Sequence, residues 1–320
     1  MTDLTLAICM YNAEKYIKET LECIIAQTMQ DFHLLIVNDC STDGSVAVIE
    51  EFFAQHPRQY EVVSFTENRG IGYARHYAER KATTKYMMFL DADDILYPNA
   101  VETMYQKITS DNDLMAVGCY LEYVNEKSKK IGGGIFLGET TKEGFYKKAA
   151  NKKLIFMQPT AIYNRALALS VGGYIIDGYH EGKPRYQDYC EDLDLWTRMS
   201  DLHKDGKAIV VVPKVLCKYR KVGNGLSSSS FNMIIKMRYT KRNLLLRRSG
   251  EKELTFIEFY ESLSKKEMRA LKRDAIAADS LRNGVFYLKR KKIFKGALEI
   301  MKSIYYRPGY FIDKLKHNLK

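Results

Sequence analysis

Cysteine, proline and tryptophan are scarce in this chain of 320 residues, which contains 6, 6 and 1 of them. The cysteines form no CxxC pair and no spacing typical of a zinc site. They are Cys9, Cys23, Cys40, Cys119, Cys190 and Cys217. This scatter argues against a secreted domain held by disulfides and against a zinc module. We expect reduced, mostly structural thiols in a cytoplasmic protein.

Long hydrophobic runs are missing as well. No stretch approaches the roughly 20 apolar residues that are needed to cross a bilayer. Residues 1–5 show neither the basic segment nor the apolar stretch of a signal peptide. Hydrophobic residues nevertheless make up 46% of the chain, which is enough for a large core. The sequence therefore predicts a folded cytoplasmic protein.

The first 225 residues have no excess of positive charge, although the net charge of the whole chain is +11. Residues 226–320 contain 23 of the 50 Lys and Arg residues but only 9 of the 39 Asp and Glu residues. The basicity is thus confined to the C-terminal part and predicts a localised basic surface. We expect a main domain over 1–225 and a basic helical region over 226–320.

Apolar runs and helix-like segments alternate over the first 98 residues. The fully apolar run at 86–90 predicts a strand buried on both faces of a sheet, and the segments 4–9, 33–37 and 60–65 are also expected to be strands. Segments with helical spacing of apolar residues lie between them. This order predicts an α/β fold with a mainly parallel, Rossmann-like sheet flanked by helices. Further strands are expected at 114–124, 131–137 and 208–212, with a polar loop that includes Tyr219 and Arg220.

Acidic and polar residues follow several of these strands. Tyr11, Asn12 and Glu14 come after the first strand, and Asp39 comes after the second. The tetrad 91–94, Asp-Ala-Asp-Asp, comes after the fourth. The carboxyl ends of strands are where an open α/β sheet binds its ligand, and clustered carboxylates suit a hard divalent cation. On the tetrad alone, an Asp-rich turn or a helix cap explains the pattern equally well.

A second acidic segment lies at 188–194. Apolar Leu193, Trp196 and Met199 recur there at helical spacing, so that Glu191 and Asp192 fall near the N-terminus of a helix. A helix N-terminus stabilises negative charge. The pair therefore either caps this helix or supplies a carboxylate to a site.

Five of these segments, in this order, resemble glycosyltransferase family 2, whose members have the GT-A fold. The resemblance covers residues 4 to about 230. Its marks are residues 10–14 (Met-Tyr-Asn-Ala-Glu), 37–45 (Val-Asn-Asp-Cys-Ser-Thr-Asp-Gly-Ser), 68–75 (Asn-Arg-Gly-Ile-Gly-Tyr-Ala-Arg), 90–94 (Leu-Asp-Ala-Asp-Asp) and 191–196 (Glu-Asp-Leu-Asp-Leu-Trp). The family implies a nucleotide-binding half over 1–98 and an acceptor-binding half over 99–225.

The resemblance also implies roles for single residues. Asp93, with Asp91 sharing the contact, would bind Mn²⁺ or Mg²⁺, and Asp192 would be the general base, with Glu191 as the second candidate. The donor nucleotide would contact Tyr11, Asn12, Glu14, Asp39, Arg75, Asp91 and Arg220. Many members have a histidine two residues after the arginine of a Tyr-Arg pair, where this chain has Val222. The metal ion is then expected to have fewer ligands from the protein.

The basic cluster 289–292 precedes a segment with one apolar helical face. This arrangement suits the inner, anionic surface of a membrane, where several basic residues act together. It suits equally a face that packs on the main domain or on a second subunit. No aromatic residues interleave with the basic ones in a pattern typical of nucleic-acid binding.

Together these observations predict a metal-dependent, inverting glycosyltransferase. Its donor would be a nucleoside diphosphate sugar, by default a UDP-sugar, and its acceptor a hydroxyl of a glycan, a lipid-linked saccharide or a glycoconjugate in surface polysaccharide synthesis. Two alternatives remain. One is a nucleotidyltransferase on a similar sheet, although the loop at 10–14 lacks the basic, glycine-rich sequence that grips a triphosphate. The other is a non-catalytic scaffold that binds membranes or partners.

Overall fold

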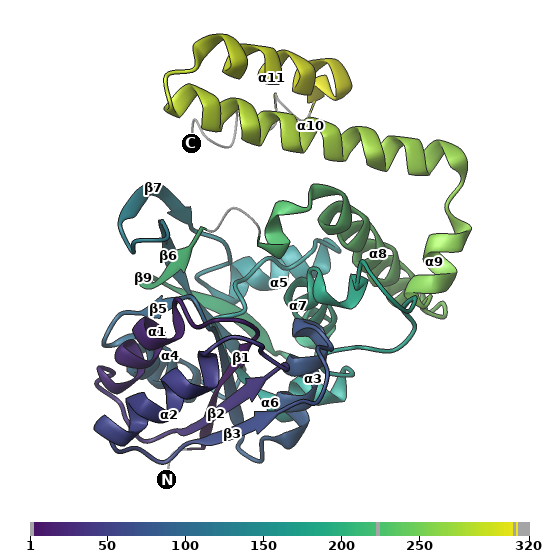
Figure 1. The fold of residues 1–320 in the computed structure, drawn as a ribbon. Helices are drawn as coiled ribbons and strands as arrows, with labels where there is room; N and C mark the ends of the chain where they lie inside the picture. Colours follow the sequence, from purple (N-terminus) through teal and green to yellow (C-terminus); the bar gives the residue numbers. More distant parts are fainter. Residues whose placement is uncertain (1–2, 222–224, 310–311, 313–320) are drawn as a thin grey trace.

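The computed structural model describes residues 3–221, 225–309 and 312, and in this part of the chain nine strands form one sheet. Figure 1 shows helices on both sides of the sheet and a pair of C-terminal helices that lies apart from it. The strand order is β3-β2-β1-β4-β8-β6-β9-β5, and β7 pairs with β6. The predicted α/β class, a mainly parallel sheet flanked by helices, is confirmed.

The nucleotide-binding half predicted over 1–98 contains four parallel strands. Every residue of β1 is buried, as the continuous apolar sequence predicts for a central parallel strand. In the register Cys9 lies opposite Asp91, so β1 and β4 end side by side. The elements are β1 (Leu4–Met10), α1 (Ile17–Ile25), β2 (His33–Asn38), α2 (Ser45–Gln55), β3 (Glu61–Ser64), α3 (Ile71–Lys81) and β4 (Tyr86–Asp91).

The next stretch mixes strand directions. β8 is antiparallel to both β4 and β6, whereas β6 and β9 are parallel. β9 continues to Arg220, well beyond the expected end at residue 212, because its second half pairs with β5 and β6. Tyr219 and Arg220 therefore belong to a strand and not to the expected polar loop. The elements are β5 (Ile95–Leu96), α4 (Ala100–Thr109), β6 (Leu114–Val124), β7 (Lys130–Ile135), α5 (Lys142–Ala150), β8 (Ile162–Asn164), α6 (Arg165–Ser170), η1 (Tyr186–Asp188), α7 (Glu191–Met199), η2 (Ser200–Asp205) and β9 (Ala208–Arg220).

The C-terminal region is helical, as its sequence predicts. Capping boxes begin both α9, at Thr255, and α10, at Ser264. α10 and α11 pack against each other as a hairpin, and α10 also contacts α8 (Figure 1). The elements are η3 (Leu226–Ser228), α8 (Ser230–Ser249), α9 (Phe256–Ser262), α10 (Lys265–Lys289) and α11 (Ile293–Tyr306).

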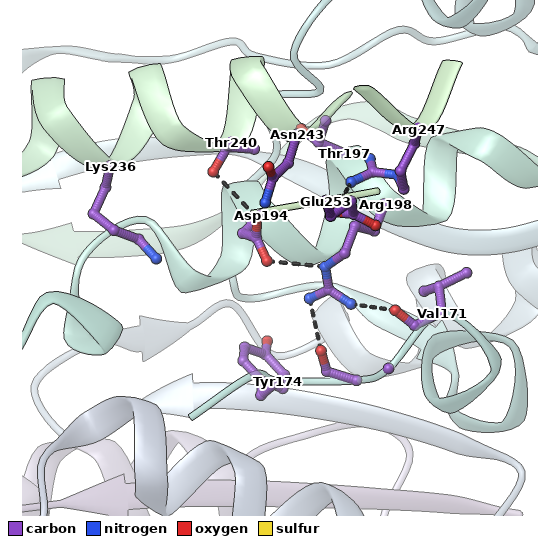
Figure 2. A network of polar contacts seen from close by, with 12 residues as sticks. Val171, Tyr174, Asp194, Thr197, Arg198, Lys236, Thr240, Asn243, Arg247 and Glu253 are labelled. Atoms are coloured by element: carbon purple, nitrogen blue, oxygen red, sulfur yellow. Dashed lines mark hydrogen bonds and ion pairs between the residues drawn. The ribbon is translucent and has the colours of Figure 1, made fainter. Parts of the chain in front are cut away.

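Helix α8 is fastened to α7 by buried polar contacts, which Figure 2 shows. Asp194 accepts from Arg198 Nε at 2.9 Å and from Thr240 Oγ1 at 3.2 Å. Arg198 in turn donates to the carbonyl oxygen of Gly173 at 2.7 Å. Every charge here has a partner, so the network fixes the position of α7, whose first two residues are Glu191 and Asp192.

A buried lysine on α8 lies beside this network. Lys236 is 1% exposed, donates to Tyr179 Oη, and lies over the rings of Tyr179 and Tyr239. Burial lowers its pKa to about 8, opposed mainly by Asp194. The native state thus binds this proton less tightly than the unfolded chain. The cost of burying the cation is full below pH 8 and falls as the pH rises from 8 towards the ordinary value of 10.5.

We expect the free energy of unfolding of the Lys236→Met chain, compared with that of the unaltered chain, to be higher at pH 7 than at pH 9.5. The substitution removes a buried cation whose cost exists only while it is charged. The difference in the free energy of unfolding should shrink by up to about 1.4 kcal/mol per pH unit above pH 8. Denaturant titrations of both chains at several pH values measure it. A difference that stays constant over this range would contradict the lowered pKa.

Candidate active site

A cavity of about 770 Å³ lies where the loops after β1 and β4 meet the start of α7. Its wall brings together residues that are far apart in the sequence. Eight of the ten predicted site residues line it: Tyr11, Asn12, Arg75, Asp91, Asp93, Glu191, Asp192 and Arg220. Two of its lining residues, Asn12 and Cys190, have φ values of 50° and 53°, a left-handed conformation that is uncommon outside glycine.

Arg75 of α3 joins the two acidic segments. Its guanidinium donates through Nη2 to Asp91 Oδ1 at 2.5 Å and through Nη1 to Glu191 Oε1. The arginine is 3% exposed, and its Nε is buried without a hydrogen-bond partner. Arg75 therefore holds the strand-end carboxylate and the helix-start carboxylate in one arrangement, and both of its Nη groups donate to protein oxygens.

The tetrad after β4 divides into different environments. Asp91 and Asp93 line the cavity, whereas Asp94 is 2% exposed and accepts from the backbone N–H of Arg220 at 2.9 Å. Burial, with the charge of Asp91 beside it, raises the pKa of Asp93 to about 6. Asp94 holds the loop against the end of β9, while Asp91 and Asp93 present carboxylates to the cavity.

Glu191 and Asp192 occupy the first turn of α7, where the helix N-terminus favours negative charge. Burial raises the pKa of Glu191, and the positive charge of Arg75 opposes this rise. Burial also raises the pKa of Asp192, again opposed by Arg75. Of these two residues, Glu191 forms an ion pair with Arg75 and Asp192 does not. The two neighbours therefore differ: Glu191 is fixed by a cation, and Asp192 faces the cavity beside it.

Arg220 lines the cavity, but its guanidinium supports the loop of Asp93. The side chain is 0% exposed. Nε donates to the carbonyl oxygen of Asp93 at 2.7 Å, Nη1 to Ser128 Oγ at 2.8 Å, and Nη2 to Glu19 Oε2 at 2.6 Å. Each guanidinium nitrogen thus donates to a protein oxygen. The arginine positions the Asp loop, and the diphosphate contact expected for it stays a prediction.

Glu14 and Asp39 do not line the cavity. Glu14 Oε2 accepts from the backbone N–H of Gly44 at 2.9 Å, which ties the loop after β1 to the start of α2. Asp39 is 3% exposed and accepts from the backbone N–H groups of Arg69 and Gly70, both at 2.7 Å. Both carboxylates support neighbouring loops. The nucleotide contacts expected for them are not tested by this arrangement. Val222 lies outside the described residues.

Asp188 is a cavity residue that the sequence patterns did not single out. Its Oδ1 accepts from the backbone N–H of Gly72 at 2.9 Å, and burial raises its pKa to about 6. A Cβ atom at Gly70, whose φ is 92°, would collide with this carboxylate. The sequence gives one indication of this contact. Gly70 and Gly72 leave room at the start of α3 for a side chain from another segment, here that of Asp188.

A family model described as "Glycosyl transferase family 2" matches residues 5–171. The match covers more than half of the chain and includes β1 to β8 and the Asp91–Asp94 loop.

The chain belongs to glycosyltransferase family 2.

Two relatives of this chain are named glycosyltransferases, and a third is named a polymerase. An uncharacterized glycosyltransferase of Haemophilus influenzae is 28% identical over 70% of this chain and 67% of its own length. The putative teichuronic acid biosynthesis glycosyltransferase TuaG of Bacillus subtilis is 25% identical over 81% of this chain and 94% of its own length. A teichoic acid poly(glycerol phosphate) polymerase of Staphylococcus epidermidis is 40% identical, but only over 36% of this chain and 16% of that protein.

Solved structures share the fold of this glycosyltransferase. TarS of S. aureus, residues 1–349 in complex with UDP-GlcNAc, superposes with a TM-score of 0.58 at 19% identity, over 97% of this chain and 92% of that one. A mannosyltransferase of Pyrobaculum calidifontis, in complex with GDP-Man and Mn²⁺, superposes with a TM-score of 0.55 at 18% identity, over 95% and 86%. These likenesses confirm the GT-A fold. Among the described residues, no helix is both long and apolar enough to span a bilayer.

Proposed function

We propose that this glycosyltransferase is metal-dependent and inverting, and that it moves a sugar from a nucleoside diphosphate to an acceptor hydroxyl. The observation that carries the proposal is the meeting of two pairs of carboxylates in one cavity, Asp91 with Asp93 and Glu191 with Asp192. One pair suits a cation that binds the leaving diphosphate, and the other suits a base for the attacking hydroxyl. The nucleotidyltransferase and scaffold alternatives do not require both pairs.

The donor set fits Mn²⁺ or Mg²⁺. No group of three His, Cys, Asp or Glu side chains forms a complete metal site in the described part of the chain. Such cations need only one or two carboxylates when substrate phosphates and water complete the shell. Asp93, whose pKa burial raises to about 6, and Asp91 would hold the ion. When bound, the metal neutralises charge that develops on the leaving diphosphate.

The donor would lie along the loop after β1. Tyr11 is 49% exposed in the cavity wall, so its ring is free to cover a nucleotide base. Asn12 accepts from the N–H of Thr42 at 2.8 Å, which holds this loop in place. Two of the structures that share the fold contain UDP-GlcNAc and GDP-Man, both nucleoside diphosphate sugars, and we propose a UDP-sugar as the donor.

The chain's own carboxylates carry the proton step. Asp192 takes the proton from the acceptor hydroxyl as that oxygen attacks the anomeric carbon, and the bond to the diphosphate oxygen breaks on the opposite face. In-line attack inverts the anomeric centre. A diphosphate leaves without protonation, so a second acid of the kind that glycosidases use is not needed. Glu191, paired with Arg75, keeps the start of α7 aligned with Asp91.

The acceptor is proposed to be a growing surface polysaccharide or its lipid-linked precursor. The names of relatives support this class: they include a teichoic acid polymerase, a teichuronic acid glycosyltransferase and a chondroitin synthase of Escherichia coli. In this chain the acceptor would enter through the half formed by residues 99–225.

Replacing Asp93 by Ala is expected to weaken Mn²⁺-dependent binding of UDP about 100-fold or more. Even the loss of a residue that only hydrogen-bonds to a metal ligand typically lowers metal affinity by about 10–100-fold. Below pH 6 protons compete for Asp93, so the affinity of the unaltered chain should fall as the pH drops. Calorimetry with UDP and Mn²⁺ at pH 5 and pH 7 measures both effects.

The matched control for this substitution is Asp205→Asn, which removes an exposed carboxylate in η2 that does not line the cavity. It should bind UDP and Mn²⁺ as the unaltered chain does. Equal affinities of the Asp93→Ala and Asp205→Asn chains for UDP with Mn²⁺ would overturn the metal assignment.

A further inference from the structure

The outer face of the α10–α11 hairpin is an exposed apolar stripe. Phe294, Leu298, Met301 and Tyr305 follow one another at helical spacing along α11, and they are 83%, 55%, 58% and 80% exposed. The opposite face of α11 carries the buried Gly296 and Ser303, which lie against α10. Large apolar side chains that are this exposed, in a row, mark a surface that meets another apolar phase or partner.

Basic residues predominate in the segment that carries the stripe. Between residues 289 and 309 the chain has seven basic residues and one acidic residue, Glu299. The basic residues are Lys289, Arg290, Lys291, Lys292, Lys295, Lys302 and Arg307. Four of them are consecutive at the turn between the two helices. The hairpin thus combines an apolar face with a strongly basic segment, residues 289–309, which we call the basic rim; within it, Arg307 is paired with Asp274 of α10.

The basic residues help to decide whether a second copy of the chain or an anionic bilayer covers the apolar stripe. Two copies of the hairpin packed face to face would bring two strongly basic rims together, and like charges at an interface are unfavourable. The surface of an anionic bilayer offers the complementary charge, and its acyl boundary takes up aromatic and aliphatic side chains. The apolar stripe and the basic rim therefore both favour an anionic bilayer.

We propose that the α10–α11 hairpin is a docking surface for an anionic lipid bilayer. The hairpin lies on the surface, with Phe294, Leu298, Met301 and Tyr305 inserted at the headgroup boundary and the lysines among the lipid phosphates. It does not cross the bilayer.

The hairpin contacts a segment at the edge of the cavity. Arg282 of α10 donates to the carbonyl oxygen of Ser228 at 2.7 Å, and Ser228 belongs to η3 together with Leu226, which lines the cavity. A docked hairpin therefore holds the cavity near the lipid surface. This consequence rests on the proposed function, because it would deliver a lipid-linked acceptor, but the docking itself does not.

Co-sedimentation of the full chain with lipid vesicles tests the proposal. Vesicles of phosphatidylcholine with about 30% phosphatidylglycerol should bind the chain at least ten times more tightly than phosphatidylcholine alone, with weaker binding at high salt. Lys291→Gln, Lys292→Gln and Lys295→Gln together should lower the affinity about 100-fold, at about fivefold for each charge. Phe294→Ser with Met301→Ser should lower it about tenfold or more on the same vesicles.

The matched control removes the same number of positive charges from other parts of the chain. Lys107→Gln, Lys147→Gln and Lys214→Gln remove three exposed lysines from α4, α5 and β9, and should leave vesicle binding within about twofold. Binding of UDP with Mn²⁺ is measured on every variant, so that a failure of docking is distinguished from a failure of the proposed activity.

Two results would overturn the proposal. One is equal binding of the unaltered chain to neutral and anionic vesicles. The other is a stable dimer in the absence of lipid that Phe294→Ser with Met301→Ser dissociates, because a second copy would then cover the stripe.

Discussion

Replacing Asp192 by Asn is expected to lower kcat by about 10²–10⁴-fold, the range that a positioned general base contributes. The amide keeps the size of the side chain at the start of α7 but cannot accept the hydroxyl proton. Binding of the donor and the metal should persist, because Asp91 and Asp93 are unchanged. Initial rates with a nucleotide sugar and calorimetry with UDP and Mn²⁺ separate the two effects.

The neighbouring Glu191 provides the comparison that makes this test decisive. Glu191→Gln removes the ion pair with Arg75 while leaving Asp192 intact. We expect a smaller loss of kcat and a measurable loss of stability, which is the reverse of the pattern for Asp192→Asn. If Glu191→Gln abolishes turnover and Asp192→Asn keeps most of it, the base is Glu191 and our assignment is wrong.

The sequence predicts the first half of the sheet well, and the reason is physical. Central parallel strands are buried on both faces, so they appear as unbroken apolar runs, as in β1 and β4. The two-residue β5 and the three-residue β8 are too short to leave a pattern. The second half of β9 includes Lys214 and Lys218, and these charges concealed a strand that only its pairing with β5 and β6 defines.

The candidate site was predictable by position but not by orientation. Strand ends place Asp91 and Asp93 at the cavity, because the carboxyl ends of neighbouring parallel strands lie together. Which way a loop side chain points depends on contacts with distant segments. Glu14 faces Gly44, and Asp39 accepts from the backbone of residues 69 and 70. Sequence alone holds no local signal for such partners.

Arg75 illustrates the same limit most clearly, because the sequence predicts a nucleotide contact for it, which stays a prediction, but gives no sign of its partners within the protein. In the structure Arg75 is buried between two carboxylates of the protein. Its pairing with Glu191 spans 116 positions of the sequence. We infer that Arg75 acts as a positioning residue, which sets the distance between the loop proposed to bind the metal and the helix proposed to carry the base.

Arg75→Met is therefore expected to have the largest effect on stability, about 3–5 kcal/mol, because it leaves Asp91 and Glu191 as neighbouring carboxylates without their cation. Glu191, which Arg75 helps to keep ionised, should then take up a proton more readily, so the loss should be greater at pH 8 than at pH 5. Denaturant titration at the two pH values measures the loss. Lys81→Met, which removes an exposed cation and its surface ion pair with Glu61 from the same helix, should cost far less than Arg75→Met.

A double substitution isolates the cause. In the chain with Arg75→Met, adding Glu191→Gln removes one of the two uncompensated charges, so the double variant should be more stable than Arg75→Met alone, although Glu191→Gln by itself destabilises the chain. This change of sign follows only if Arg75 and Glu191 act as a pair. If the two losses simply add, the arginine contributes through packing against Phe89, whose ring centre lies 5.6 Å from its guanidinium carbon, and the bridge between the two acidic segments is not what holds the site together.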